Sequence, residues 1–145
     1  MHILIINGPN LNLLGRREPE IYGHESYEDL VALLKNAAAE LGLELSFFQS
    51  NHEGAIVDAI QEAYGTADGI LINPAAYTHT SIAIPDAIRA VDLPAVEVHI
   101  SDPDTREPFR RISYVRPACI ATVKGKGLQG YVEALKILKG WQEAR

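Results

Sequence analysis

The chain has 145 residues, 47% of them apolar and 22% charged, which is the composition of an ordinary globular domain and excludes a disordered or fibrous chain. Its formal net charge of −6 argues against nucleic acid or an anionic membrane as the main partner, because such binding requires Lys and Arg to neutralise phosphates. One cysteine excludes an intrachain disulfide and suits a reducing compartment, and no apolar run approaches the roughly 20 residues of a membrane span, so we expect one cytoplasmic domain over residues 1–145.

The first part of the chain predicts a buried strand, a loop and a helix. Residues 3–6 are a continuous apolar and β-branched run, typical of a strand buried on both faces, whereas the polar residues 8–25, with several Gly and Pro, predict a long loop. Ser26 and Asp29 resemble a capping box in which Asp replaces the usual Glu. A helix therefore begins there, and its apolar spacing continues until Gly42.

The rest of the chain continues the alternation of strand and helix. Residues 43–47 alternate apolar and polar side chains, which is typical of a strand half exposed at a sheet edge. The later elements are a helix over about 53–64, a strand over 69–72, a helix over about 81–91, strands over 95–101 and 119–123, and a terminal helix over 130–142. Pro85 belongs in the first turn of its helix or marks a kink.

This alternation predicts an α/β fold: a doubly wound, open parallel sheet of five strands with helices on both faces. A half-polar second strand and continuous apolar first and third strands fit the flavodoxin-like order 2-1-3-4-5, which places the second strand at the edge. Ligands of such folds bind outside the carboxyl ends of the strands, so the chemistry is expected there.

Polar side chains do gather after the predicted strands. They are Asn10, Asn12, Arg16, Arg17 and Tyr22 after the first, Asn73, Thr78 and His79 after the third, Glu97, His99 and Ser101 at the end of the fourth, and Arg106, Arg110 and Arg111 beyond it. Five of the eight arginines thus belong to two loops expected on the same rim. In an acidic protein this grouping favours binding of a small carboxylate or phosphate over a set of solvated surface charges.

The histidine near the end of the fourth strand has three possible interpretations. His99 is a hydrogen-bonded histidine near the core, a general acid oriented by Glu97, or a metal ligand together with Glu97 and His79. Its place at the carboxyl end of a strand, beside a carboxylate, favours the general acid. The metal reading has no compact ligand spacing to support it.

Tyr22 is either a half-packed aromatic or a reactive phenol. Its loop also carries Arg16 and Arg17. A phenol titrates near pH 10, so a phenolate at neutral pH requires about 4 kcal/mol of preference for the charged form. One or two desolvated guanidinium groups can supply that preference. The sequence therefore permits a tyrosinate base.

Two other features are interpreted as structural. Residues 125–130 match the dinucleotide pattern G-x-G-x-x-G, but only 15 residues follow, and the fingerprint needs a further strand and an acidic residue about 20 positions on. A tight turn is the better interpretation. Cys119 is placed inside the apolar fifth strand and read as a packed thiol.

Several long motifs, in order along essentially the whole chain, resemble the type II 3-dehydroquinate dehydratases. They are residues 7–12 (Asn-Gly-Pro-Asn-Leu-Asn), 14–19 (Leu-Gly-Arg-Arg-Glu-Pro), 22–23 (Tyr-Gly), 73–81 (Asn-Pro-Ala-Ala-Tyr-Thr-His-Thr-Ser), 97–101 (Glu-Val-His-Ile-Ser), 106–110 (Arg-Glu-Pro-Phe-Arg) and 127–131 (Gly-Leu-Gln-Gly-Tyr). The resemblance implies a single catalytic domain, a hydro-lyase of the shikimate pathway that converts 3-dehydroquinate to 3-dehydroshikimate by anti elimination through an enolate, without cofactor or metal.

The resemblance also implies roles for individual residues. Tyr22 would be the tyrosinate base assisted by Arg17, Asn10 would hold a water against the enolate oxygen, and His99, oriented by Glu97, would protonate the departing hydroxyl. Asn73, His79 and Arg110 would hold substrate hydroxyls, and Ile100 and Ser101 the carboxylate. Residues 14–23 would close as a lid. Trimers packed into homododecamers would bring Asp86 of one subunit to a neighbour's site.

Two positions depart from the family pattern. Ala75 replaces a usual glycine, so its methyl is expected to crowd the ligand or strain a turn that needs a positive φ. Asp102 replaces a usual asparagine and is expected to weaken anion binding unless it points away or pairs with an arginine.

The alternatives to a dehydratase are a non-catalytic module that binds small carboxylates on the same fold and a metal-assisted lyase.

Overall fold

A parallel sheet of five strands in the order β2-β1-β3-β4-β5 forms the middle layer of the computed structural model, which describes residues 1–16 and 18–145. The strands are β1 (His2–Asn7), β2 (Glu44–Gln49), β3 (Gly69–Asn73), β4 (Ala95–His99) and β5 (Ala121–Lys124). Each pair of neighbours runs parallel. The predicted strand order is confirmed.

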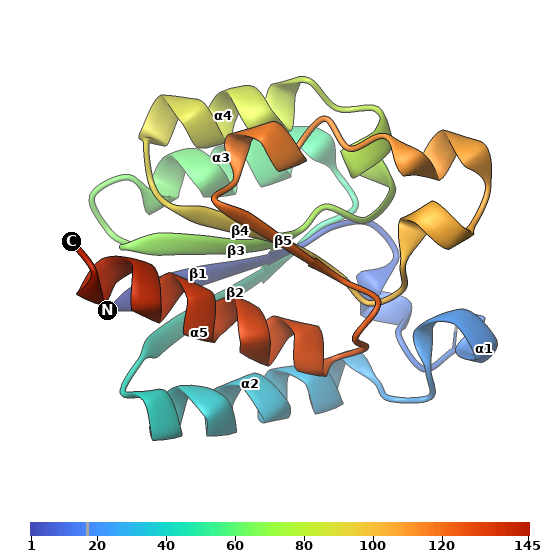
Figure 1. Ribbon diagram of the computed structural model, residues 1–145, viewed down its shortest axis with the longest axis horizontal. Helices are drawn as coiled ribbons and strands as arrows, with labels where there is room; N and C mark the ends of the chain where they lie inside the picture. The colour runs from blue at the N-terminus through green and yellow to red at the C-terminus, as the bar shows by residue number, and fades with distance from the viewer. Residues whose placement is uncertain (17) are drawn as a thin grey trace.

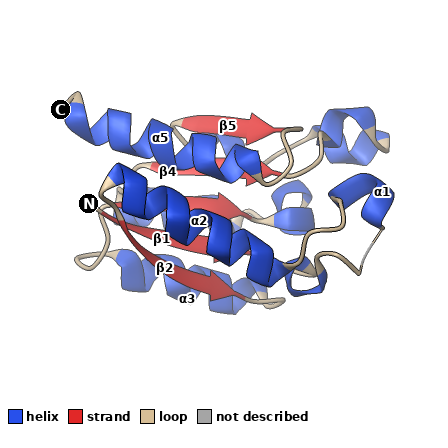
Figure 2. Cartoon of the chain, turned by 90° about the horizontal axis from the view of Figure 1, so that it is seen from below, coloured by secondary structure: helices blue, strands red, loops and turns tan. Residues whose placement is uncertain are grey.

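Two long helices cover each face of the sheet (Figures 1 and 2). They are α2 (Tyr27–Leu41) and α5 (Gln129–Glu143) on one face, and α3 (Glu53–Ala63) and α4 (Ala83–Val91) on the other. Each face has its own buried cluster, one containing Leu30, Leu34 and Leu135 and the other Ile56 and Ile88. The doubly wound architecture is therefore confirmed.

Burial along the strands follows the apolar pattern of the sequence. Every residue of β3 and β4 is buried, whereas five of the six residues of the edge strand β2 are only half-buried. In the register of β1 and β3, Asn7 lies opposite Asn73. The two asparagines that end these strands are thus neighbours at the carboxyl edge of the sheet.

The helix boundaries have local causes that the sequence carries. Ser26 Oγ accepts the Asp29 N–H at 3.1 Å while the Asp29 carboxylate accepts the Ser26 N–H at 2.9 Å, which confirms the capping box. Gly42 ends α2 at a φ of 70°, a conformation that other residues adopt at a cost. Pro85 falls in the first turn of α4, where its missing N–H costs no helical hydrogen bond.

The structure corrects three boundaries. The predicted loop 8–25 contains two short helices, a 3₁₀ helix at Leu11–Leu13 and α1 at Pro19–Tyr22, which begins with a proline. Cys119 is not inside the fifth strand: a 3₁₀ turn that contains Pro117 precedes it, and β5 begins only at Ala121. The fourth strand ends at His99 rather than residue 101, because the next two carbonyls accept N–H groups from the turn after β5.

That turn is the region of the G-x-G-x-x-G match. Gly125 and Gly127 have φ values of 76° and 60°, and a Cβ at Gly130 would lie 3.3 Å from Val123. The glycines therefore serve a tight turn and close packing of α5 on the sheet, as expected. In the part of the chain that the structure describes, no helix has the length and apolarity to cross a membrane.

Candidate active site

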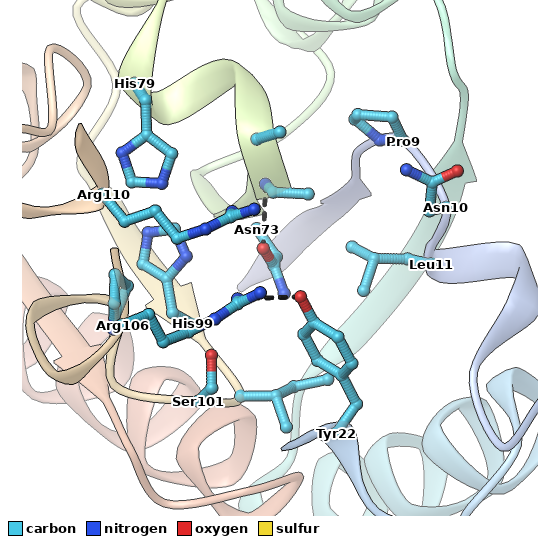
Figure 3. A pocket seen from close by; sticks show the side chains of 14 residues that line it. Pro9, Asn10, Leu11, Tyr22, Asn73, His79, His99, Ser101, Arg106 and Arg110 are labelled. Carbon is cyan, nitrogen blue, oxygen red and sulfur yellow. Dashed lines mark hydrogen bonds between the residues drawn. The ribbon is translucent and has the colours of Figure 1, made fainter. Parts of the chain in front are cut away.

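A pocket opens at the carboxyl ends of β1, β3 and β4 (Figure 3). Its lining consists of Pro9, Asn10, Leu11, Tyr22, Asn73, Ala75, Ala76, His79, His99, Ile100, Ser101, Pro103, Arg106 and Arg110. The side chains come from five separate segments, which the parallel sheet brings to one edge. This is the place at which the fold predicted a ligand.

Most of the site residues expected from the sequence line this one pocket. They are Tyr22, His99, Asn10, Asn73, His79, Ile100, Ser101 and Arg110. Glu97 lies behind His99, and Asp86 does not line the pocket of its own chain but is an exposed side chain 3.8 Å from Arg89. Arg17 lies outside the described residues.

Glu97 and His99 form the most buried polar pair of the site. They project from the same face of β4, and His99 Nε2 donates to Glu97 Oε2 at 2.7 Å. Glu97 is completely buried and His99 is 6% exposed. Because Nε2 is engaged by Glu97, Nδ1 is the ring nitrogen that can face a ligand in the pocket.

Three hydroxyl groups complete the surroundings of the Glu97 carboxylate. Thr78 and Ser113 donate to Oε2, Ser113 at 2.9 Å, and Thr122 donates to Oε1 at 3.3 Å. Burial by itself raises the pKa of Glu97, but the hydrogen bond and charge of His99, with the hydroxyl donors, outweigh burial and lower the pKa to about 2. The carboxylate is therefore ionised at neutral pH and holds the imidazole ring in one orientation.

This carboxylate predicts a defined loss of stability in acid. The pKa of Glu97 is about 2 in the fold against 4.5 for an ordinary Glu, so its stabilisation is complete above pH 4.5 and is lost as the pH falls through 2. The loss integrates to about 3 kcal/mol. Urea unfolding at pH 6 and pH 3 is expected to show about 2 kcal/mol of this loss in the wild type, because Glu97 is still largely ionised in the fold at pH 3, and a smaller loss in Glu97→Gln. Equal falls in both proteins would contradict the assignment.

His79 enters the pocket from the turn after β3 in a neutral form suited to accept a hydrogen bond. Its Nδ1 donates to the carbonyl of Ile112 at 2.7 Å, which leaves Nε2 as the acceptor of the neutral ring. Burial lowers the pKa of His79, against the opposing effect of that carbonyl. The ring can therefore receive a hydrogen bond from a hydroxyl group of a ligand.

Tyr22 lies at the end of α1, against an arginine from the opposite loop. Arg106 Nη1 donates to Tyr22 Oη at 2.8 Å, and the guanidinium carbon is 5.3 Å from the centre of the Tyr22 ring. Figure 3 shows Tyr22 on one side of the pocket and Arg106 reaching toward it from the side on which His99 lies. The hydrogen bond and the ring contact together hold the Tyr22 hydroxyl next to the positive charge of Arg106.

Asn73 and Ala75 shape the floor of the pocket. Asn73 is 3% exposed, and its Oδ1 accepts the N–H of Ala75 at 3.0 Å. Ala75 has a φ of 52°, so this position does require the left-handed region, as expected from the departure from glycine. A non-glycine residue in this conformation costs roughly 1–2 kcal/mol, which the surrounding structure must offset.

The expected effect of Asp102 on anion binding is moderated by its partners. Its Oδ1 accepts the N–H of Asp104 and lies 3.8 Å from Lys124 Nζ. It does not line the pocket. Asp102 thus pairs with a lysine rather than an arginine, and Lys124 also pairs with Asp104.

The expected grouping of arginines is only partly found. Arg106 and Arg110 line the pocket, whereas Arg16 and Arg111 do not. Arg110 is held by Glu107, whose carboxylate accepts from Nε at 2.7 Å. The pocket nevertheless presents two guanidinium groups, which suits a ligand that carries a carboxylate.

The structure also bears on the reactivity of Cys119 and on the hypothesis of a metal site. Burial raises the pKa of Cys119 to about 12, and the charge of Glu97 adds to this, so the thiol is protonated at neutral pH and a poor nucleophile. Among residues 1–16 and 18–145, no three His, Cys, Asp or Glu side chains are grouped as ligands of a metal ion.

Sequence reasoning missed several residues of the site. Arg106 was noticed only as one of a group of arginines, although its place four residues before Arg110 was a usable signal. Thr78 was noticed only among the polar residues after the third strand, and Ser113 and Thr122 were not noticed at all. These three side chains come from separate segments and meet at Glu97. No sequence pattern predicts such a cluster of hydroxyl groups around a carboxylate.

Comparison with known proteins shows the same family throughout. The family model described as dehydroquinase class II matches residues 1–139. A 3-dehydroquinate dehydratase of Corynebacterium glutamicum is 54% identical over 136 residues, covering 94% of each chain, and one of Clostridium acetobutylicum is 53% identical over 139 residues, covering 96% of each. The crystal structure of the type II dehydroquinase of Butyrivibrio crossotus superposes with a TM-score of 0.94 at 52% identity, covering 95% of this chain and 97% of that one.

Proposed function

This chain belongs to the class II dehydroquinase family, and from that premise we propose how the residues of its pocket carry out the family's reaction. The chain is a hydro-lyase that dehydrates 3-dehydroquinate to 3-dehydroshikimate, a step of the shikimate pathway. The observation that carries the proposed mechanism is a single pocket in which a tyrosine held by an arginine faces a histidine held by a carboxylate.

The reaction needs one base and one acid. A proton leaves the carbon next to the ketone, and the electron pair of that C–H bond forms an enolate. The enolate then collapses to the conjugated ketone and expels the hydroxyl on the following carbon, which is protonated as it leaves and departs as water. Two groups on different sides of one pocket can perform the two proton transfers on opposite faces of the ring, which is an anti elimination.

Tyr22 is the proposed base. As the phenolate it takes the proton next to the ketone, and the guanidinium of Arg106, 2.8 Å from Oη, stabilises its charge before the transfer. Arg17, which lies outside the described residues, remains a proposed second cation for this step. Asn10 is proposed to hold a water against the enolate oxygen, since it lines the same pocket as Tyr22.

His99 is the proposed acid. Its Nδ1–H protonates the leaving hydroxyl, and the buried Glu97 carboxylate on Nε2 fixes the orientation of the ring. After each turnover the proton on Tyr22 must return to His99. Water in the open pocket provides the route, so no co-reactant is needed.

The remaining residues are proposed to hold the substrate. Asn73, His79 and Arg110 bind its hydroxyl groups, and the Ser101 hydroxyl with the backbone of Ile100 binds its carboxylate. Neutral His79 accepts from a hydroxyl through Nε2. The contact between Arg106 and Tyr22 holds α1 over the pocket, which supports the proposal that residues 14–23 act as a lid.

An ultraviolet assay tests the function. Purified protein mixed with 3-dehydroquinate in the presence of a chelator is expected to generate the absorbance of the conjugated product. A silent trace from folded protein favours the alternative, a non-catalytic module that binds small carboxylates. Activity that is lost to the chelator and restored by a metal favours the metal-assisted lyase.

A higher assembly is proposed from an exposed apolar surface beside the site. Ile82, Phe109 and Ile112 are exposed by 57%, 62% and 55%, and Tyr114 by 42%. Asp86 is also exposed and lies about one helical turn after Ile82, in the first turn of α4. We propose that trimers, packed into dodecamers, cover this surface and bring Asp86 to a neighbour's pocket. Light scattering that gives a monomer mass would contradict this.

The lone cysteine supports a cytoplasmic location.

A further inference from the structure

Behind the pocket, two buried side chains that the mechanism does not use, Tyr131 and Asn7, extend a hydrogen-bonded chain from Asn73. Asn73 Nδ2 donates to Tyr131 Oη at 2.9 Å, and Tyr131 Oη donates to Asn7 Oδ1 at 2.6 Å. Tyr131 and Asn7 are completely buried, and neither lines the pocket. The chain thus joins the ends of β1 and β3 to the first turns of α5.

The direction of these hydrogen bonds is fixed by chemistry. A phenol has one proton, and burial raises the pKa of Tyr131, so the hydroxyl keeps that proton. Because the proton goes to Asn7, the oxygen of Tyr131 can only accept from Asn73. On the other side, the Asn73 Oδ1 accepts the N–H of Ala75 (Figure 3). Both ends of the Asn73 amide are therefore specified.

The same three side chains could also be hydrogen-bonded in the opposite direction, and that alternative would change what Asn73 does. Asn7 Nδ2 is buried and makes no hydrogen bond among the described residues, although the Asn7 amide lies near enough to the Tyr27 hydroxyl to oppose the rise that burial gives to the pKa of Tyr27. Reversing the chain, with Asn7 Nδ2 donating to Tyr131 and Tyr131 donating to Asn73 Oδ1, would satisfy that donor. The reversal would also turn the Asn73 amide and abandon the N–H of Ala75. A buried donor left unpaired in a native structure needs such an explanation.

We propose that Tyr131 is a positioning residue that fixes which end of the Asn73 amide faces the substrate. The Asn73 amide has two N–H groups and two acceptor lone pairs. One N–H is used by Tyr131 and one lone pair by Ala75. One donor and one acceptor then remain in known positions for a hydroxyl group of the ligand. This inference rests on the proposed binding of substrate by Asn73.

The variant Tyr131→Phe removes the hydroxyl and keeps the ring. Asn73 then loses its hydrogen-bond acceptor, and its amide is free to turn. We expect KM for 3-dehydroquinate to rise about tenfold while kcat stays within a few-fold, because the lost contact binds substrate and transition state alike. Asn7→Ala, which removes the acceptor of the Tyr131 proton from further away, is expected to raise KM in the same direction.

A double variant separates positioning from a structural role. If Tyr131 acts through Asn73, the change Tyr131→Phe raises KM when Asn73 is present. The same change leaves KM unaltered when it is made in the Asn73→Ala variant. Ile137→Val, which trims the same helix away from the pocket, is the matched control and is expected to leave KM unchanged. An unchanged KM in Tyr131→Phe, or an equal rise with and without Asn73, overturns the inference. Absence of turnover in the wild type would overturn the proposed function instead.

Discussion

Tyr22→Phe is expected to lower kcat by roughly 10²–10⁴-fold, the usual contribution of a general base. The variant keeps the ring that Arg106 covers at 5.3 Å but lacks the oxygen to which Arg106 donates. Without that oxygen the variant lacks the proposed base for the proton next to the ketone. Binding of the substrate is expected to be largely retained, because the residues proposed to hold its carboxylate and hydroxyl groups are unchanged.

The measurement pairs steady-state kinetics with titration of quinate, which keeps the carboxylate and lacks the ketone. Turnover is expected to collapse while the Kd for quinate changes only a few-fold. Tyr64→Phe is the matched control, since it removes the same oxygen from a side chain that is 72% exposed and does not line the pocket. Normal turnover in Tyr22→Phe would show that the base is another group.

His99→Ala is expected to lower kcat by a similar factor, roughly 10²–10⁴-fold, because the leaving hydroxyl then departs without its acid. The removal also strands the Glu97 carboxylate, which loses its 2.7 Å partner. Added imidazole is expected to restore part of the rate by occupying the vacated space. Restoration depends on pH, since only the protonated form of imidazole delivers the proton.

His79→Ala is the companion variant that distinguishes the two histidines. His79 is proposed to bind a hydroxyl group rather than transfer a proton, so its loss is expected to raise KM about tenfold and to change kcat little. If the two variants show the same kinetic pattern, the division of roles between the histidines is wrong.

The fold was predictable because its signals are local and repeated. The capping box of Ser26 and Asp29 and the alternation over residues 43–47 each specify an element without help from the rest of the chain. The fifth strand was less predictable. Cys119 continues an apolar run in the sequence, but Pro117 holds the preceding residues in a turn, and the strand starts later.

The site was predictable to the extent that it depends on strand ends. Asn73 and His99 lie where a parallel sheet must place them, whereas Arg106 reaches Tyr22 across the pocket from 84 positions further along the chain. The bond between Tyr131 and Asn7 spans 124 positions. Such contacts depend on the packing of α5 against the sheet, and no periodicity in the sequence encodes them.

The stereochemistry of the elimination tests the central claim most directly. The substrate would carry deuterium on one face of the carbon between the ketone and the carbon with the leaving hydroxyl. With Tyr22 and His99 acting from opposite sides of the pocket, deuterium anti to the hydroxyl is expected to pass to solvent, and deuterium syn to it to remain in the product. Loss of the syn label, with retention of the anti label, would contradict the account.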